Sequence, residues 1–288
     1  MHPLINNYCK ICKAKNVEYN ISLTSDENRP VYPYLLDKTG DRIIYSIGTS
    51  HGRSYVIGLN QENRWIVSKG NGLSYTRYPF LHIGEFGDDT LGLLLISDAK
   101  RDFLLGQEIA NLGIKTNHME HVIILEKELQ LTNGHIIKPV LLQYNVECPF
   151  RISDAAYIPR DLIKAEVKKW CVLNKHGFSD NYLIAADVMI RNLRILHDNQ
   201  ILHNAIHEQN YTWALELLDF ELACSPVHPY DDEDNQRHVK SLFSREILQT
   251  YHIICQIADV LYEEIDNELL EDLFHENGFD ISRYKLHV

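Results

Sequence analysis

The spacing of apolar residues along the chain changes once, from strand-like to helical, and this limits the folds that are open to it. Between residues 42 and 68, short segments rich in Ile, Val, Tyr and Trp are separated by Gly, Asn or His, as in a sheet. From Pro159 onward the apolar residues recur at helical spacing, most clearly at residues 180–197 and 244–264. A β-rich first part followed by a mainly helical second part predicts an α+β fold.

Three regions are expected from this pattern. Residues 1–40 are polar with frequent turn signals, and we expect an irregular N-terminal extension there. A β-rich lobe should occupy residues 41–150 and hold one long helix, at residues 97–113. A helical lobe should occupy residues 151–288.

A hairpin with polar ends interrupts the helical part at residues 201–221. Two apolar runs flank its polar loop, so that His203 and Asn210 lie around the loop and Asp219 follows the second run. Amide and carboxylate oxygens at neighbouring strand ends suit Mg²⁺ beside a polyphosphate. The interval from His203 to Asn210 is typical of a protein-kinase-like catalytic loop, with Ala205 at the position of the catalytic aspartate. The triplet that begins at Asp219 resembles the DFG segment without its glycine. The alternative is a buried hairpin whose polar ends are incidental.

A lysine ends one of the predicted strands. Lys69 is followed at once by Gly70 and Gly72, and a lysine placed there can reach nucleotide phosphates while the glycines let backbone N–H groups approach an anion. Asp102, beside the apolar face of the expected helix, is the candidate ion-pair partner of Lys69, and Glu108 is the second candidate. The alternatives are an ordinary strand followed by a turn, and an exposed acid near a helix N-terminus.

The order of these segments is that of a bilobal protein-kinase-like fold, in which a nucleotide lies in the cleft between the lobes. We therefore expect Lys69, from the first lobe, and Asp219, from the second, to converge on one triphosphate. Arg151 follows a predicted strand at the start of the second lobe and is a candidate phosphate clamp, with a surface arginine as the alternative.

Composition narrows the classes of partner and the compartment. The formal net charge of −12 argues against a broad nucleic-acid-binding face, which needs clustered Lys and Arg. No apolar run approaches the length of a membrane span, and the N-terminus lacks the apolar segment of a secretory signal, so we expect a cytoplasmic protein without membrane contact. Cys9 and Cys12 form a lone CxxC pair, which favours reduced cysteines over a structural zinc site completed by a distant His.

Taken together, these segments resemble the selenoprotein O family of kinase-like proteins, from about residue 52 to 262. The stretch KGNGLSYTR, which ends at Arg77, is similar to the family's strand-end lysine and glycine-rich segment. RDFLLGQEIANLGIKT, at residues 101–116, is similar to the helix that carries the lysine's acidic partner, and places Asp102 in that role. The turn before Arg53 resembles a glycine–arginine turn that reaches phosphate.

Two further segments carry the resemblance. YNVECPFR resembles a segment with two phosphate-binding arginines, of which Arg151 is present and Tyr144 replaces the other. The short interval from Asn210 to Asp219 matches the family, which also lacks the catalytic aspartate at the position of Ala205.

The resemblance implies an ATP-dependent enzyme that transfers AMP to Ser, Thr or Tyr hydroxyls of proteins and releases pyrophosphate. It implies that Lys69 and the candidate arginines Arg53, Arg77 and Arg151 contact phosphates, with Gly70 and Gly72 beside them. Asp102 would orient the lysine, and Asn210 and Asp219 would hold Mg²⁺ or Mn²⁺. The family's proton acceptor falls at Gln209, which cannot act as a base; by sequence, His207 and Glu208 are nearby substitutes.

Two other functions remain open on the same scaffold. One is a phosphotransferase that acts on a protein or a small molecule. The other is a nucleotide-binding pseudokinase without turnover, which acts as a scaffold or sensor.

Overall fold

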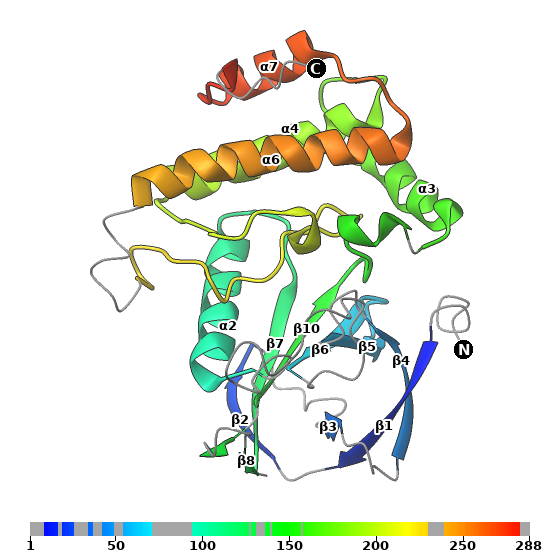
Figure 1. Cartoon of the computed structure of the whole chain (residues 1–288), viewed down its shortest axis with the longest axis vertical. Coiled ribbons are helices and arrows are strands. Elements are labelled where there is room, and N and C mark those ends of the chain that lie inside the picture. The colour runs from blue at the N-terminus through cyan, green and yellow to red at the C-terminus, as the bar shows by residue number, and fades with distance from the viewer. Residues whose placement is uncertain are drawn as a thin grey trace. The chain divides into compact units, whose positions relative to one another are not determined.

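The computed structural model divides the chain into two compact units, each with its own packing (Figure 1). The first unit comprises Met1–Gln107 and Asn117–Pro149, and the second comprises Glu108–Thr116 and Phe150–Val288. The predicted three-part division of the chain stays a prediction. The structure describes residues 9–16, 19–25, 34–36, 42–48, 54–70, 94–126, 128–130, 136–138, 140–156, 158–229 and 239–282.

Within the described residues, the first unit is built on one eight-stranded sheet in the order β2-β7-β10-β6-β5-β4-β1-β3, in which every neighbouring pair is antiparallel. A two-stranded sheet, β8 with β9, accompanies it. The strands are β1 (Cys9–Asn16), β2 (Tyr19–Thr24), β3 (Tyr34–Leu36), β4 (Arg42–Gly48), β5 (Ser54–Leu59), β6 (Trp65–Lys69), β7 (His118–Leu125), β8 (Leu129–Gln130), β9 (Ile136–Ile137) and β10 (Val140–Val146).

The first 40 residues contain three strands of this sheet, so the expectation of an irregular extension is wrong. Strand β1 pairs with β4 and β3, and β2 pairs with β7 at the other end of the strand order. These segments have a weak apolar pattern, and their strand conformation depends on pairing with residues at least 18 positions away, as between Asn16 and Tyr34. Strand propensity is strongly dependent on such context.

The two strands at the centre of the sheet are buried. All five residues of β6 and all seven of β10 are buried, and the two strands are direct neighbours. The long helix α2 (Ile96–Asn111) buries Ala99, Phe103 and Leu105. It matches the predicted helix, and it stops where Gly113 takes a φ of +82° and donates its N–H to the carbonyl of Ala110.

The second unit is mainly helical. Helices α4 and α6 run alongside each other, and α7 packs against α4 (Figure 1). Twelve residues of α4 are buried. A helix that is buried to this extent needs apolar side chains on more than one of its faces, and α4 has them. The helices are α3 (Arg160–Lys169), α4 (Asn181–Asp198), α6 (Val239–Leu261) and α7 (Asn267–Glu276), with 3₁₀ helices η2 (Ile152–Ala156), η3 (Trp170–Leu173) and η4 (Glu208–Asn210).

The predicted α+β fold class is confirmed: a β-rich unit with one long helix precedes a mainly helical unit. Among the described residues, no helix has both the length and the apolar character needed to cross a bilayer. Cys171 and Cys255 carry free thiols, and the side chains of Cys9 and Cys12 lie outside the described part of the chain.

Candidate functional site

In the first unit, Lys69 and Asp102 form the expected ion pair. Lys69 Nζ lies 2.8 Å from Asp102 Oδ2, and the two side chains are only 2% and 1% exposed. Lys69 is the last residue of β6, where Ser54 of β5 and Leu142 of β10 flank it on the neighbouring strands. Asp102 comes from α2, so the pair joins the centre of the sheet to the helix.

The burial of this pair has a cost. Each ion loses most of its hydration, and their mutual attraction offsets that loss only in part, so a buried ion pair adds little stability over an apolar pair of the same shape. The geometry therefore calls for a reason other than stability. A lysine whose position is determined by a carboxylate suits the binding of an anion at the strand end.

Gly70 is required by packing. Its φ is +94°, and a Cβ atom at this position would lie 2.5 Å from the carbonyl oxygen of Val140 and 2.8 Å from Leu94 Cβ. The glycine thus lets the chain after Lys69 pass close to the start of β10, and the predicted role of its N–H in anion binding stays a prediction. Arg53, Gly72 and Arg77 lie outside the described residues.

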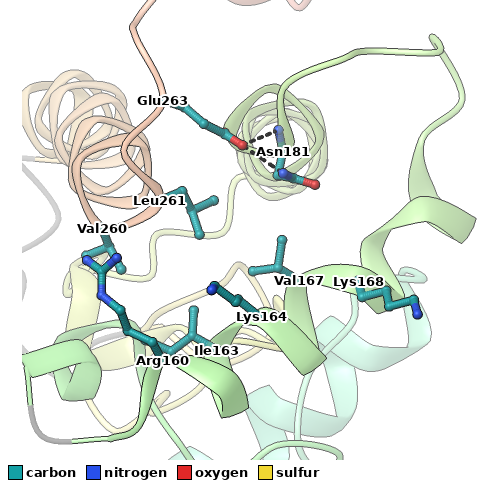
Figure 2. Close-up of a pocket in the computed structure, with 9 residues that line it drawn as sticks. All are labelled: Arg160, Ile163, Lys164, Val167, Lys168, Asn181, Val260, Leu261 and Glu263. Atoms are coloured by element: carbon teal, nitrogen blue, oxygen red, sulfur yellow. Dashed lines mark hydrogen bonds between the residues drawn. The ribbon is translucent and has the colours of Figure 1, made fainter.

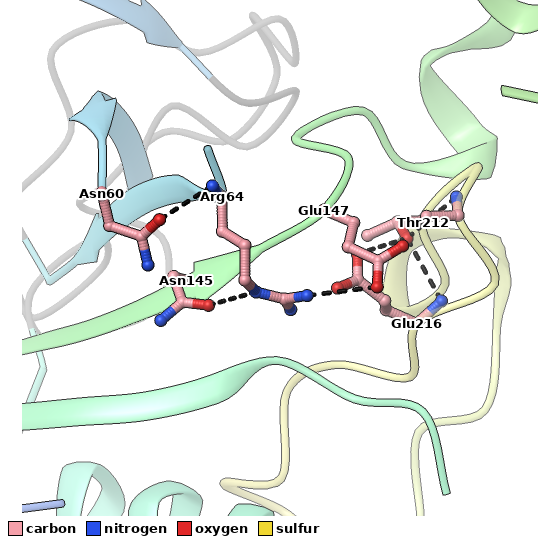
Figure 3. Close-up of polar contacts among 7 residues, drawn as sticks. Asn60, Arg64, Asn145, Glu147, Thr212 and Glu216 are labelled. Atoms are coloured by element: carbon pink, nitrogen blue, oxygen red, sulfur yellow. Dashed lines mark hydrogen bonds and ion pairs between the residues drawn. The ribbon is translucent and has the colours of Figure 1, made fainter. Parts of the chain in front are cut away.

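A polar contact network fixes the register of the strand that carries the lysine (Figure 3). The Arg64 backbone N–H donates to Asn60 Oδ1 at 2.8 Å, and the Arg64 guanidinium contacts Asn145 Oδ1 and, at 3.1 Å, Glu147 Oε1. Asn145 lies on β10 and Arg64 directly precedes β6, so these contacts tie the two central strands together.

In the second unit, His203 links the two runs of the predicted hairpin. Its ring is completely buried; Nε2 donates to the Leu218 carbonyl at 3.0 Å, and Nδ1 accepts from the Ala205 N–H at 3.3 Å. Burial holds the pKa of His203 below its usual range, so the ring is neutral near pH 7. Both ring nitrogens are engaged in orienting the loop.

Asn210 has an amide with a defined orientation. Its Nδ2 donates to the Ala205 carbonyl at 2.9 Å, and its backbone carbonyl accepts from the Leu218 N–H at 2.9 Å. The side chain is 3% exposed. Since the nitrogen is engaged with Ala205, Oδ1 is the atom that would bind a cation, which is the orientation that an oxygen-seeking metal requires.

Asp219 has a left-handed backbone, with φ at +69°, and is half-buried. A non-glycine residue in this conformation is strained, and such strain is concentrated at functional sites. The preceding residue, Leu218, is held on both sides, because its N–H donates to Asn210 and its carbonyl accepts from His203.

The predicted hairpin is only partly correct. The structure has isolated bridges, Leu202 with Cys224 and Tyr211 with Leu217, in place of two regular strands. Positive φ angles at Leu215 and Asp219 interrupt the extended backbone.

The turn before Asp219 is built around Thr212 and Glu216 (Figure 3). Thr212 Oγ1 donates to Glu216 Oε2 at 3.1 Å and accepts the N–H groups of Ala214 and Glu216 at 3.2 Å. Glu216 is fully buried. This compact loop sets the path of the chain into Asp219.

Arg151 is a buried cation, 5% exposed, at the start of the second unit. Its backbone N–H donates to Asp154 Oδ2 at 2.9 Å, and none of the residues that the structure describes forms an ion pair with its guanidinium. Arg151 lies close enough to His207 to act on it: burial lowers the pKa of His207, Glu208 and Asp219 raise it, and the charge of Arg151 lowers it further. A buried guanidinium near His207 suits a phosphate group.

Sequence reasoning missed the anchor of the loop, which comes from α6. The fully buried Glu246 accepts the Asn204 N–H through Oε1 at 2.6 Å and pairs with His197 through Oε2 at 3.0 Å. Arg245 Nη2 donates to the Asn204 carbonyl at 3.1 Å and to its Oδ1 at 2.5 Å. The signal in the sequence is a glutamate within the apolar stripe of an amphipathic helix.

The second candidate partner of Lys69 has another role. Glu108 belongs to the second unit, where its Oε2 accepts from Ser225 Oγ at 2.8 Å.

No family model and no curated protein matches the chain. Among solved structures, one match is described as the crystal structure of a Toxoplasma gondii specific rhoptry antigen kinase domain. It is 12% identical, covers 85% of this chain and 79% of that chain, and has a TM-score of 0.40. A likeness of this degree assigns no activity to this protein.

Proposed function

We propose that this protein is an ATP- and Mg²⁺- or Mn²⁺-dependent adenylyltransferase that transfers AMP to hydroxyl groups of other proteins, as the resemblance to the selenoprotein O family implies. Lys69 and Arg151 bind phosphates, Asp102 orients the lysine, and Asn210 and Asp219 hold the metal. Arg53, Gly70, Gly72 and Arg77 are further candidate contacts of the nucleotide.

The observation that carries the proposal is the buried ion pair of Lys69 and Asp102. It places a cation at the end of a central strand at an energetic cost that stability does not explain. A polyphosphate is the ligand whose negative charge best complements such a lysine.

The donor set in the second unit fits a divalent metal. The available amide oxygen of Asn210 and the carboxylate of Asp219 are hard oxygen ligands, and Mg²⁺ takes few protein ligands beside waters and phosphate oxygens. When bound, such a metal would neutralise charge on the phosphates. Arg151 adds a cation to the same unit, and the rigid loop around His203 holds the two proposed ligands in place.

The proposed step is a displacement at the α-phosphorus of ATP. A protein hydroxyl oxygen forms a bond to that phosphorus, the bond from phosphorus to the bridging oxygen breaks, and pyrophosphate leaves with the electron pair. The hydroxyl proton passes to a base or to water. His207 Nδ1 already accepts the Gln209 N–H at 3.2 Å, which leaves Glu208, half-exposed beside it, as the better candidate for that base.

One observation favours a second candidate, a nucleotide-binding pseudokinase. Ala205, at the position of a kinase's catalytic aspartate, contributes a carbonyl that orients Asn210 and has no side-chain base. A phosphotransferase on the same scaffold would need its base from elsewhere.

Incubation of the purified protein with ATP and Mg²⁺ or Mn²⁺, followed by mass spectrometry of the protein and of added candidate substrates, separates these functions. An added adenylyl group supports the proposal, an added phosphate selects a phosphotransferase, and unchanged mass with intact ATP binding selects a pseudokinase. Lys69→Met and Asp219→Ala should each abolish ATP-dependent labelling. Lys169→Met and Asp198→Ala, which change exposed surface ion pairs, are the matched controls and should label normally.

A further inference from the structure

A cavity of about 420 Å³ lies within the second unit, formed by α3, the start of α4 and the end of α6 (Figure 2). Its volume falls in the range of small-molecule sites. None of the residues proposed above for nucleotide or metal binding lines it, so it is a separate feature of the molecule.

The cavity has an apolar wall on two helices. Ile163 and Val167, one turn apart on α3, are buried, and Val260 and Leu261 contribute from the end of α6 (Figure 2). Branched aliphatic side chains on opposite sides of a cavity can hold a flexible apolar chain and exclude water from it.

The rim of the cavity is basic. Arg160, Lys164 and Lys168 follow one another at intervals of four residues on α3, and therefore lie on one side of the helix. In Figure 2 the ammonium group of Lys164 extends into the space between the helices, whereas that of Lys168 extends away and only its stem borders the cavity. Arg160 is anchored at the mouth, where its guanidinium carbon lies 3.9 Å from the centre of the Tyr262 ring.

These cations are not neutralised within the described part of the chain. No described carboxylate forms an ion pair with Arg160, Lys164 or Lys168, whereas the adjacent Lys169 is paired with Glu166 at 2.6 Å.

The one carboxylate in the lining, Glu263, is occupied by backbone and amide groups. Its Oε1 accepts the backbone N–H and Nδ2 of Asn181 at 3.1 and 2.7 Å, and its Oε2 accepts the Tyr182 N–H at 2.7 Å. The Glu263 carboxylate thus caps the first turn of α4. Since the lining contains three cationic side chains and this one carboxylate, the cavity has an excess of positive charge.

We propose that this cavity binds an amphiphilic organic anion, with its apolar chain between α3 and α6 and its carboxylate or phosphate head on Lys164 and Arg160. The apolar wall alone would accept a neutral chain, and the lysines alone would accept any small anion. The combination selects a molecule that carries both features.

The test uses decanoate and decyl phosphate below their micelle concentrations, titrated into the full chain by calorimetry, with methyl NMR shifts of Ile163, Val167, Val260 and Leu261 to locate the site. Both anions should bind saturably and shift these methyl signals. Decanol and acetate, which each lack one feature, should bind at least about tenfold more weakly.

Matched variants test the contribution of charge. Lys164→Glu should weaken decyl phosphate binding by about tenfold, and Val260→Ser should weaken it by severalfold. Lys169→Glu makes the same charge change on the same helix outside the cavity and should stay within about twofold of wild type. Equal losses for Lys164→Glu and Lys169→Glu, decanol binding as tight as decanoate, or no saturable binding would each overturn the proposal.

Vesicles of phosphatidylserine and phosphatidylcholine, used in parallel, separate the two sources of this chemistry. If only the free anions bind, the ligand is a free metabolite-like molecule. If the vesicles also bind, and Lys164→Glu abolishes that binding, the ligand is a lipid headgroup. Vesicle binding that Lys164→Glu leaves unchanged contradicts the site.

Discussion

Replacement of Lys69 by Met and of Asp102 by Leu, singly and together, separates what the buried ion pair does for stability from what it does for ligand binding. Each single variant removes one partner of the 2.8 Å ion pair and leaves the other charge in a site that is at most 2% exposed. The double variant leaves two apolar side chains there. We expect both single variants to be strongly destabilised and the double variant to recover most of the loss.

The magnitude follows from the geometry. At 2.8 Å, with an effective dielectric constant of about 20, the attraction between the two charges is about 6 kcal/mol. Desolvation of the two ions offsets most of it, so the pair as a whole contributes little, but removal of one partner should cost about 3–5 kcal/mol. The double variant should lie within about 1 kcal/mol of wild type, which gives a coupling energy of about 5 kcal/mol or more.

The three tryptophans of the chain make the measurement specific to one unit. Trp65 lies on β6 in the first unit, four residues from Lys69, whereas Trp170 and Trp213 stack on each other in the second unit. With 5-fluorotryptophan, urea titration followed by ¹⁹F NMR reports the unfolding of each unit through its own resonances. The single variants should lower the free energy of unfolding that is measured from the Trp65 resonance.

ATP affinity measured on the same four proteins tests the function. The double variant should regain stability without regaining ATP binding, because it lacks the lysine. Additive losses of stability would refute the coupling that we infer from the burial of the pair, and ATP binding by the double variant equal to wild type would refute the role of Lys69.

Three further predictions concern single positions. Gly70→Ala should lower the free energy of unfolding by about 3 kcal/mol or more, because the new Cβ would lie 2.5 Å from the Val140 carbonyl oxygen and the φ of +94° is unfavourable for alanine. Stability should fall as the pH drops below 6.5, by up to about 1.4 kcal/mol per pH unit for His203, because this buried ring is neutral in the folded state and takes up a proton on unfolding. Glu246→Ala should cost about 1–3 kcal/mol and should speed amide hydrogen exchange at Asn204, whose N–H loses its acceptor.

Each of these predictions has a matched control. Gly113 has a similar φ, +82°, but a Cβ atom at this position would meet nothing within 4 Å. If Gly113→Ala lowers the free energy of unfolding as much as Gly70→Ala does, the packing argument is contradicted. His203→Gln should flatten the pH dependence of the unfolding midpoint between pH 7 and 5, and the exposed His252→Gln should leave it unchanged. Arg245→Ala leaves the carboxylate in place, so amide exchange at Asn204 should respond less than in Glu246→Ala.

Local sequence patterns predicted the central elements of the first unit. Strand β6 is a short apolar run that ends in a lysine, and α2 has apolar residues at helical spacing followed by a glycine. Both elements could therefore be predicted without knowledge of the residues that pack against them. The partner of Lys69 was predicted for a similar reason, since Asp102 lies beside the apolar face of a recognisable helix.

Features that depend on distant residues were not predicted. Strands β1 and β2 owe their conformation to β4 and β7, and the loop at Asn204 is held by side chains more than forty positions away on α6. The left-handed backbone of Asp219 carries no glycine signal, and the amide of Asn210 is oriented by a backbone carbonyl, which no side-chain pattern encodes.

Strand β6 has hydrogen-bonded neighbours on both sides, β10 and β5, and is the fourth of the eight strands in the order. Its backbone can be released only by opening the middle of the unit, so the Lys69 amide should be among the last to exchange with deuterium. A ligand that reaches this lysine thus encounters a nearly motionless cation and loses little entropy in ordering it. Differences in affinity among variants of this chain would then arise from the other residues that contact the ligand.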